Sequence, residues 1–140
     1  MEETKKAPIT VTALVNAPLK EVWDKWTLPE HITKWCFAAD TWHAPSAEND
    51  LHEGGRFMTR MEARDGSFGF DFGGIYTQVS THQCIAYILA DERTVRITFT
   101  EENGATYIEE VFDPENENPV EMQRDGWQAI LNNFKKYAES

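Results

Sequence analysis

The feature that most constrains the fold is one long amphipathic segment near the C-terminal end of the chain. Val120–Ala138 repeats apolar residues at three- and four-residue spacing, the period of an α-helix. One stripe holds Gln123, Trp127, Ile130, Leu131, Phe134 and Tyr137 or Ala138. The opposite side holds Arg124, Gln128, Asn132 and Lys135. The segment therefore predicts a helix with one face that must be buried against another element.

The sequence pattern in the middle of the chain predicts β-strands that are joined mainly by hairpins. The expected strands are Ile9–Val15, Thr41–Ala44, Arg56–Arg64, Ser67–Ser80, Gln83–Leu89, Thr94–Thr100 and Ala105–Phe112. Asp65-Gly66 and Asn103-Gly104 are strong turn signals between neighbouring strands. Gly73-Gly74 predicts a bulge or a sharp bend in the longest strand. An antiparallel sheet of this kind needs cover on its apolar face.

Two short helices are expected between the first and second strands. Leu19–Trp26 has helical apolar spacing, and a second helix is predicted from Pro29 to about Trp35. Asn16 is expected to cap the first of these helices. The order is then one strand, two short helices, six strands and one long helix. This order predicts an α+β fold in which the terminal helix covers the sheet.

Length and charge narrow the class of protein. A chain of 140 residues with 41% hydrophobic residues is expected to form one domain, residues 1–140, with a core at about 9–138. Its 24 acidic and 13 basic residues give a net charge of −11. A negative field repels phosphate backbones and anionic lipid surfaces. We therefore expect no nucleic-acid partner and no membrane insertion.

The N-terminal residues and the two cysteines help to predict the cellular location of the protein. Met1–Lys6 is polar and charged with no apolar run after it, which predicts no signal peptide. The longest apolar run, Ile85–Ala90, is far shorter than the ~18 residues of a membrane span. Cys36 and Cys84 stand far apart and are expected to be reduced and partly buried, a disulfide being the alternative. A cytoplasmic location follows as the expectation.

Several short motifs occur in a particular order along the chain. They are Asn16-Ala17-Pro18 with Val22-Trp23, Thr27-Leu28-Pro29-Glu30 with Trp35, Gly54-Gly55-Arg56-Phe57, Gly73-Gly74-Ile75-Tyr76, Thr106–Phe112, and Gly126-Trp127 with Leu131. In order and spacing they resemble the START-like (SRPBCC) superfamily, and within it the family named after the activator of the heat-shock-protein-90 ATPase. The resemblance spans about Ile9–Tyr137. It implies a helix-grip fold, in which a curved antiparallel seven-stranded sheet wraps around a long C-terminal helix.

The same resemblance implies an apolar cavity between the sheet and the terminal helix. Relatives use this cavity for lipids, sterols, polyketides or plant hormones, and a minority catalyse cyclisation or dehydration. In the eukaryotic activator, a domain of this kind is joined to a separate N-terminal chaperone-binding domain. Here the chain begins at the first strand, so we expect a stand-alone, single-domain form.

The aromatic residues are the main candidates for a binding site. They make up 12% of the chain, and either they line a cavity or they fill the core. The candidate ligand-binding residues are Trp23, Trp35, His43, Phe57, Phe70, Phe72, Tyr76, Tyr87, Phe99, Trp127, Leu131 and Phe134. Among the polar groups, Tyr76, Tyr87 and His43 are expected to reach the cavity. A surface position is the alternative for His43.

Sequence patterns typical of catalysis or metal binding are weak. The four histidines lie on different elements, and no H-x-x-x-H, H-x-E or G-x-S-x-G spacing occurs. Glu62 and Asp71 lie on neighbouring strands and could form a carboxylate pair. The alternative is that both face solvent and that Arg60 or Arg64 balances them. We predict no catalytic residue, no metal ion and no cofactor.

These observations favour a binding protein over an enzyme. The predicted partner is a small hydrophobic or amphipathic molecule held between the sheet and the terminal helix. One alternative is an enzyme that uses His43 or a tyrosine as general acid or base on a polyketide-like or carbonyl substrate in the same cavity. Another is a chaperone-associated protein that acts through its surface. Both a monomer and a homodimer are compatible with the sequence.

Overall fold

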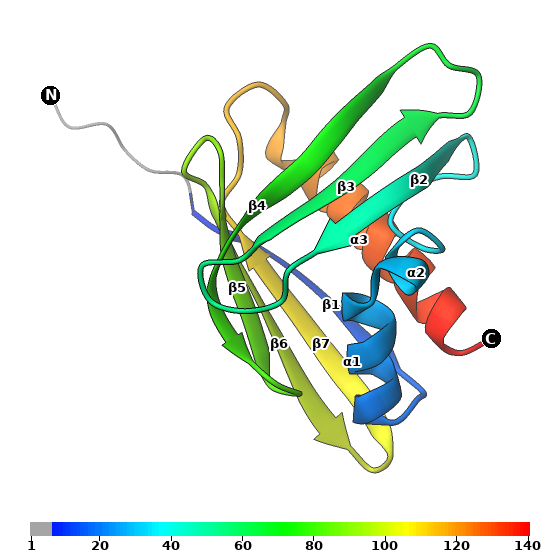
Figure 1. Cartoon of the computed structure of the whole chain (residues 1–140), viewed down its shortest axis with the longest axis vertical. Coiled ribbons are helices and arrows are strands. Elements are labelled where there is room, and N and C mark those ends of the chain that lie inside the picture. The colour runs from blue at the N-terminus through cyan, green and yellow to red at the C-terminus, as the bar shows by residue number, and fades with distance from the viewer. Residues whose placement is uncertain (1–6) are drawn as a thin grey trace, which may run out of the picture.

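The computed structural model describes residues 7–140 and contains one curved sheet that wraps around a long helix (Figure 1). Residues 1–6, for which the sequence predicts no signal peptide, lie outside the described residues. In chain order the elements are β1 (Ile9–Val15), α1 (Leu19–Thr27), α2 (Pro29–Ile32), β2 (Trp42–Asn49), β3 (Arg56–Ala63), β4 (Gly69–Ser80), β5 (Cys84–Leu89), β6 (Thr94–Glu102), β7 (Ala105–Phe112) and α3 (Val120–Ala138). The predicted order of elements is confirmed.

All seven strands form a single antiparallel sheet in the order β1-β7-β6-β5-β4-β3-β2. β2 to β7 follow one another as neighbours, while β1 pairs with β7 so that Ile9 lies opposite Phe112. β1 and β2 are therefore the two edge strands, and α1 and α2 lead the chain from one edge to the other. The α+β, helix-grip fold class predicted from the sequence is confirmed.

The α3 helix lies beside the edge strand β1 and uses its side chains to satisfy that strand's free carbonyl groups. Lys135 Nζ donates to the carbonyl oxygen of Leu14 at 2.6 Å, and Gln128 Nε2 donates to that of Thr12 at 3.0 Å. The apolar stripe faces inward, and Leu131 and Phe134 have no exposed surface. The edge-strand bonds and the buried stripe together fix how α3 lies across the sheet.

Three predictions about the first third of the chain are wrong in detail. Asn16 does not cap α1; its backbone N–H donates to Glu139 Oε2 at 2.8 Å, and the capping position is Pro18. α2 ends at Ile32, although turns continue to Trp35. β2 does not stop before Pro45 but continues to Asn49, with its register shifted between His43 and Ser46. Proline is tolerated there because β2 is an edge strand and the shift removes the need for its missing N–H.

Of the bulge or sharp bend predicted at Gly73-Gly74, the bulge is wrong, and the bend stays a prediction. Both glycines keep regular pairing with β3, and the irregularity in β4 falls between Tyr76 and Gln78. A Cβ atom at Gly73 would lie 2.5 Å from the carbonyl oxygen of Phe57, and one at Gly74 would lie 2.5 Å from that of Ile88. The glycines are needed because the neighbouring strands approach too closely for a side chain.

Candidate functional site: an aromatic cavity between the sheet and α3

A cavity of about 430 Å³ lies between the sheet and the first part of α3. Its lining comes from β3 to β7, from α3, and from residues at the end of α1 and around α2. Pockets that hold small molecules usually measure about 300–1,000 Å³ and are mostly apolar with few polar groups. In size and lining, this cavity resembles such a pocket.

The cavity exists partly because α3 has a glycine on the side that faces it. Gly126 lines the cavity, and a Cβ atom built on it would meet no heavy atom within 4 Å. Its backbone is ordinary helix, so no special conformation requires glycine at this position. A larger residue at position 126 would project into open space and reduce the cavity.

The aromatic rings of the lining support one another through edge contacts. Phe57 meets Tyr87 edge to face with ring centroids 4.6 Å apart, and Phe72 meets Trp127 in the same way at 6.0 Å. The other face of Trp127 stacks on Phe112, with centroids 3.9 Å apart. Such pairs hold rings in fixed orientations. The aromatic wall of the cavity is therefore held in place by contacts between its own rings.

Tyr76 is held by a chain of hydrogen bonds to α1. Its hydroxyl donates to Asn49 Oδ1 at 2.5 Å, and Asn49 Nδ2 donates to the carbonyl oxygen of Thr27 at 2.6 Å. Burial raises the pKa of the Tyr76 hydroxyl, so the group stays protonated. Because this donor is already used, Tyr76 shapes the cavity more than it offers a free proton.

The most unusual group in the cavity is the carboxyl of Glu110, on the inward face of β7. Glu110 is only 6% exposed and lines the cavity, yet within residues 7–140 it forms no hydrogen bond or ion pair. Burial raises its pKa to about 8. The group is therefore mostly protonated at neutral pH while the cavity holds no partner for it.

Two further protonated groups surround this carboxyl. The hydroxyl of Tyr87 and the thiol of Cys36 lie within electrostatic reach of Glu110. Burial, followed by the Glu110 charge, raises the pKa of Cys36 to about 12 and that of Tyr87 well above its usual value. Across the sheet, Glu110 pairs with Ile97 and Tyr87 lies two strands away on β5. The polar end of the cavity is thus a small cluster of neutral acids.

The rim of the cavity is fixed by the residues between β7 and α3. Gln123 Oε1 accepts from the backbone N–H of Glu115 at 2.8 Å, while Gln123 Nε2 donates to the carbonyl oxygen of Asn118 at 2.8 Å. Arg93 also lines the cavity, and its Nε donates to Asp91 Oδ2 at 2.6 Å. The charged groups at the rim are therefore engaged with protein partners.

The structure places the candidate residues from the sequence in three positions: the cavity lining, the core and, for His43 alone, the outer part of the sheet. Those that line the cavity are Trp35, Phe57, Phe70, Phe72, Tyr76, Tyr87 and Trp127. Trp23, Phe99, Leu131 and Phe134 lie outside the lining and pack in the core. His43 lies on β2 away from the lining, with Nε2 3.8 Å from Glu62 Oε1. The apolar stripe of α3 predicts which residues are buried. It does not predict which half of the helix borders the cavity.

Sequence reasoning missed Glu110, although a signal for it exists. In β7, Thr106, Ile108 and Phe112 are buried and alternate with more exposed residues. The apolar side chains of Ile108 and Phe112 set the parity of the strand, which puts Glu110 on the inward face. The alternation of residues along β7 therefore predicts that the Glu110 side chain faces the core.

The other candidates from the sequence are accounted for outside the cavity. Glu62 and Asp71 are balanced by Arg60, whose nitrogens lie 2.9 and 3.4 Å from their carboxylate oxygens. This confirms the alternative in which Glu62 and Asp71 face solvent and an arginine balances their charges. Both cysteines are free and buried, as predicted. Within residues 7–140 no cluster of histidine, cysteine or acidic residues could hold a metal ion. No helix in that range is long and apolar enough to cross a membrane.

Comparison with known proteins adds the family. The model of the family described as "Activator of Hsp90 ATPase homolog 1-like protein" matches residues 16–139. A solution structure of a protein from Cytophaga hutchinsonii is 54% identical, with 94% of this chain and 92% of that chain covered and a TM-score of 0.82. The AHSA1-like protein of Aeromonas hydrophila is 37% identical over the same shares, with a TM-score of 0.86. A Chromobacterium violaceum protein at 20% identity covers 96% of this chain and 98% of its own, with a TM-score of 0.83, and shows the fold alone. No curated protein matches the chain significantly.

Proposed function

The chain belongs to the family of Activator of Hsp90 ATPase homolog 1-like proteins, and on that premise we propose that it binds a small hydrophobic or amphipathic molecule in the cavity between the sheet and α3. The observation that carries the proposal is the combination of an aromatic-walled cavity of about 430 Å³ with a buried carboxyl that has no partner. The START-like fold commonly holds hydrophobic ligands in this position, which supports the same reading.

The energy available in the cavity is adequate for binding. Removing roughly 200 Å² of a ligand's apolar surface from water gains about 5 kcal/mol. A similar area of cavity wall is covered at the same time, and the cost of association offsets part of the sum. We therefore expect micromolar affinity for an apolar molecule that fits.

Nile red, a neutral fluorescent dye, tests this proposal. The wild-type protein should take up one dye molecule, seen as enhanced fluorescence and as a one-to-one complex in native mass spectrometry. Gly126→Leu should weaken binding at least tenfold because its side chain occupies the cavity. Gly126→Ala is the matched control, since it makes the same gain in helix propensity but leaves most of the space open.

Two results would contradict the proposal. One is the absence of Nile red binding to the wild-type protein at dye concentrations up to the solubility limit. The other is equal binding by the wild-type and Gly126→Leu proteins, which would place the dye elsewhere on the molecule.

Interaction with the Hsp90 chaperone is a second candidate, favoured by the description of the matched family. Stimulation of the chaperone's ATPase by the wild-type protein would support it. Equal stimulation by Gly126→Leu would assign that activity to the surface, whereas loss of stimulation would link it to the cavity. The enzyme alternative based on His43 has no support in the geometry, because this side chain lies outside the cavity lining.

A further inference from the structure

Glu110 differs from the other charged residues of the cavity lining in having no partner within the described chain. Arg93 pairs with Asp91, and Glu115 Oε1 accepts from the backbone N–H of Asn118 at 2.6 Å. Glu110 is only 6% exposed, and the cavity that it lines has mainly aromatic and aliphatic walls. Its oxygens are open to the cavity, since no fully buried side-chain oxygen or nitrogen of the described residues lacks a hydrogen-bond partner. Removing a carboxyl from bulk water without a partner from the protein costs stability. Such a group is accounted for if a ligand supplies the missing partner.

We propose that the ligand of this cavity is an amphipathic amine whose protonated nitrogen pairs with the Glu110 carboxylate while its apolar body lies among the aromatic rings. This inference rests on the proposed function, because it names the chemical class of the molecule that the cavity holds. The hydroxyl of Tyr87 lines the same cavity within electrostatic reach of Glu110 and offers the ligand a further polar contact.

The surroundings of Glu110 favour a cation over other head groups. The titratable groups of the cavity lining are Tyr76 on β4, Tyr87 on β5, Cys36 after α2, Arg93 before β6 and Glu115 before α3. None of the lining residues on α1, β3, β6 or α3 is titratable. The single cation, Arg93, already faces Asp91, so no protein cation is available to Glu110 among the described residues.

The aromatic lining and the net negative charge of the protein also favour a cationic ligand. Aromatic faces attract organic ammonium ions, and the polar end of this cavity is bordered by Tyr87 and Phe57. The net charge of −11 raises the local concentration of cations around the protein. An anionic ligand would meet repulsion from this overall field and, wherever Glu110 is ionised, from its carboxylate as well.

Amine binding should be coupled to the release of a proton from Glu110. Burial keeps this carboxyl mostly protonated at neutral pH, whereas pairing with an ammonium ion requires the ionised form. Binding at pH 7 should therefore release about 0.9 proton per ligand, and affinity should rise roughly 50-fold between pH 6 and pH 8. A neutral ligand would show neither effect.

The test compares naphthylethylamine with naphthylethanol, which have the same apolar body and differ in the head group. Calorimetric titrations of the wild-type protein, in two buffers of different ionisation enthalpy, should give at least tenfold tighter binding and proton release for the amine. Glu110→Gln should lose at least tenfold in amine affinity and keep its alcohol affinity. Glu109→Gln is the matched control, because it removes the same charge from the adjacent position on the outer face of β7.

The outcomes separate this inference from the proposed function. If the alcohol binds as tightly as the amine, with no proton release, the amine proposal is wrong and the hydrophobic site remains. If neither molecule binds and Nile red does not bind, the proposed function fails as well. If Glu110→Gln does not fold, proton release in the wild-type protein and its dependence on pH still decide the question.

Discussion

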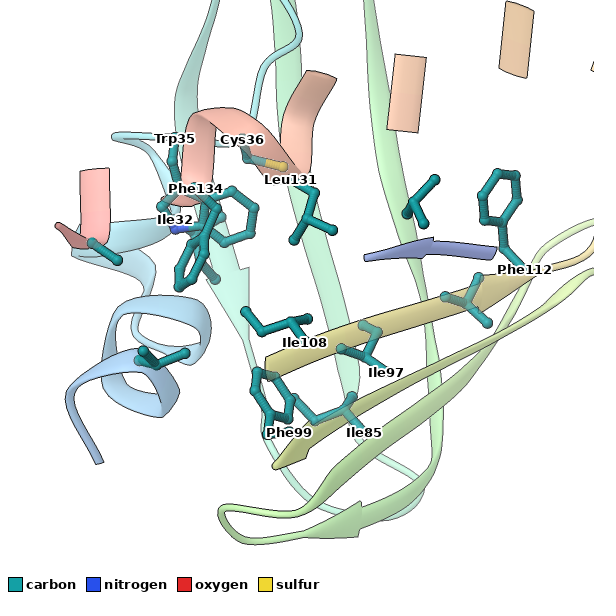
Figure 2. Packing of buried hydrophobic residues seen from close by; sticks show 14 of the residues in the cluster. Ile32, Trp35, Cys36, Ile85, Ile97, Phe99, Ile108, Phe112, Leu131 and Phe134 are labelled. Carbon is teal, nitrogen blue, oxygen red and sulfur yellow. The ribbon is translucent and has the colours of Figure 1, made fainter. Parts of the chain in front are cut away.

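The interior has two regions that are rich in aromatic side chains. In one, which we call the filled region, the rings pack in the core; in the other, the open region, they line the cavity. In the filled region, Phe99, Leu131 and Phe134 belong to the buried core cluster (Figure 2), and Trp23 of α1 meets Phe99 with ring centroids 5.3 Å apart. Trp26 and Trp35 also line the cavity and lie against Phe134, with ring centroids 4.7 and 4.8 Å from it, so they mark the border between the two regions. In the open region, Phe57, Phe72, Tyr87, Glu110, Gly126 and Trp127 surround the cavity.

The two regions lie along one helix and differ in what covers them. α1 packs against the C-terminal part of α3, where Lys25 Nζ reaches the carbonyl oxygen of Ala138 at 3.3 Å. Near the beginning of α3, Gly126 contributes no side chain to the interior. Aromatic residues thus pack in the core where α1 meets the end of α3 and line a cavity beside the first part of α3.

The largest effect is expected in the filled region. Phe134→Ala should lower the free energy of unfolding by about 3–5 kcal/mol, because a fully buried ring is lost and a void remains. Urea denaturation monitored by circular dichroism measures this change. Nile red affinity of the folded variant should stay within about twofold of the wild type. A loss below about 1 kcal/mol would mean that this region is not tightly packed.

In the open region, Glu110 should make stability depend on pH. Its pKa is about 8 in the folded protein and 4.5 in its ordinary state, so the folded protein binds the proton more tightly. The associated stability is present in full below pH 4.5 and is lost as pH rises through 8. Glu110→Gln should remove this dependence and be more stable than the wild type at pH 9, by at most about 5 kcal/mol.

Urea denaturation of both proteins at pH 5 and pH 9 measures this difference, with Glu109→Gln as the control for a change in net charge. We expect the stability advantage of Glu110→Gln over the wild type to be larger at pH 9 than at pH 5. An equal difference at the two pH values would show that the Glu110 carboxyl ionises as freely as an exposed one.

Trp127 both packs against a core residue and lines the cavity. One face stacks on Phe112 and the other side lines the cavity, so Trp127→Ala should cost only about 2 kcal/mol. The same change should weaken Nile red binding at least fivefold, because a wall of the cavity is lost. A cost above about 4 kcal/mol with unchanged dye binding would assign Trp127 to the filled region.

The smallest effect is expected at His43, outside both regions. His43→Ala removes a half-exposed side chain near Glu62 and should change stability by less than about 0.5 kcal/mol. Nile red affinity should be unchanged. Loss of dye binding in a folded His43→Ala protein would show that β2 contributes to the site after all.

The sequence predicted the architecture well because the fold follows from periodicity. The alternation along β3 and the helical stripe of α3 both depend on burial, which local sequence reflects directly. The course of β2 through Pro45 could not be predicted, because tolerance of proline depends on the strand being at the edge of the sheet. The role of Gly73 depends in the same way on the approach of a neighbouring strand.

The lining of the cavity could be predicted only in part for the same reason, and its role in binding stays a prediction. Phe57, Phe72 and Tyr87 line the cavity, whereas Phe99 and Phe134 belong to the filled region. Periodicity predicts that a ring faces inward, but whether it touches another ring or open space depends on segments that are distant in sequence. Along α3, the cavity lies at the first part of the helix, whereas α1 packs against the C-terminal part.

Nitrogen–proton correlation NMR with Nile red tests the division of the interior into an open and a filled region. Backbone amide shifts should move along β3, β4 and β5 and around Gly126, and the amides of Phe99 and Phe134 should stay within the noise. Uniform small shifts, or the largest shifts around Phe99 and Phe134, would contradict the division into an open and a filled region.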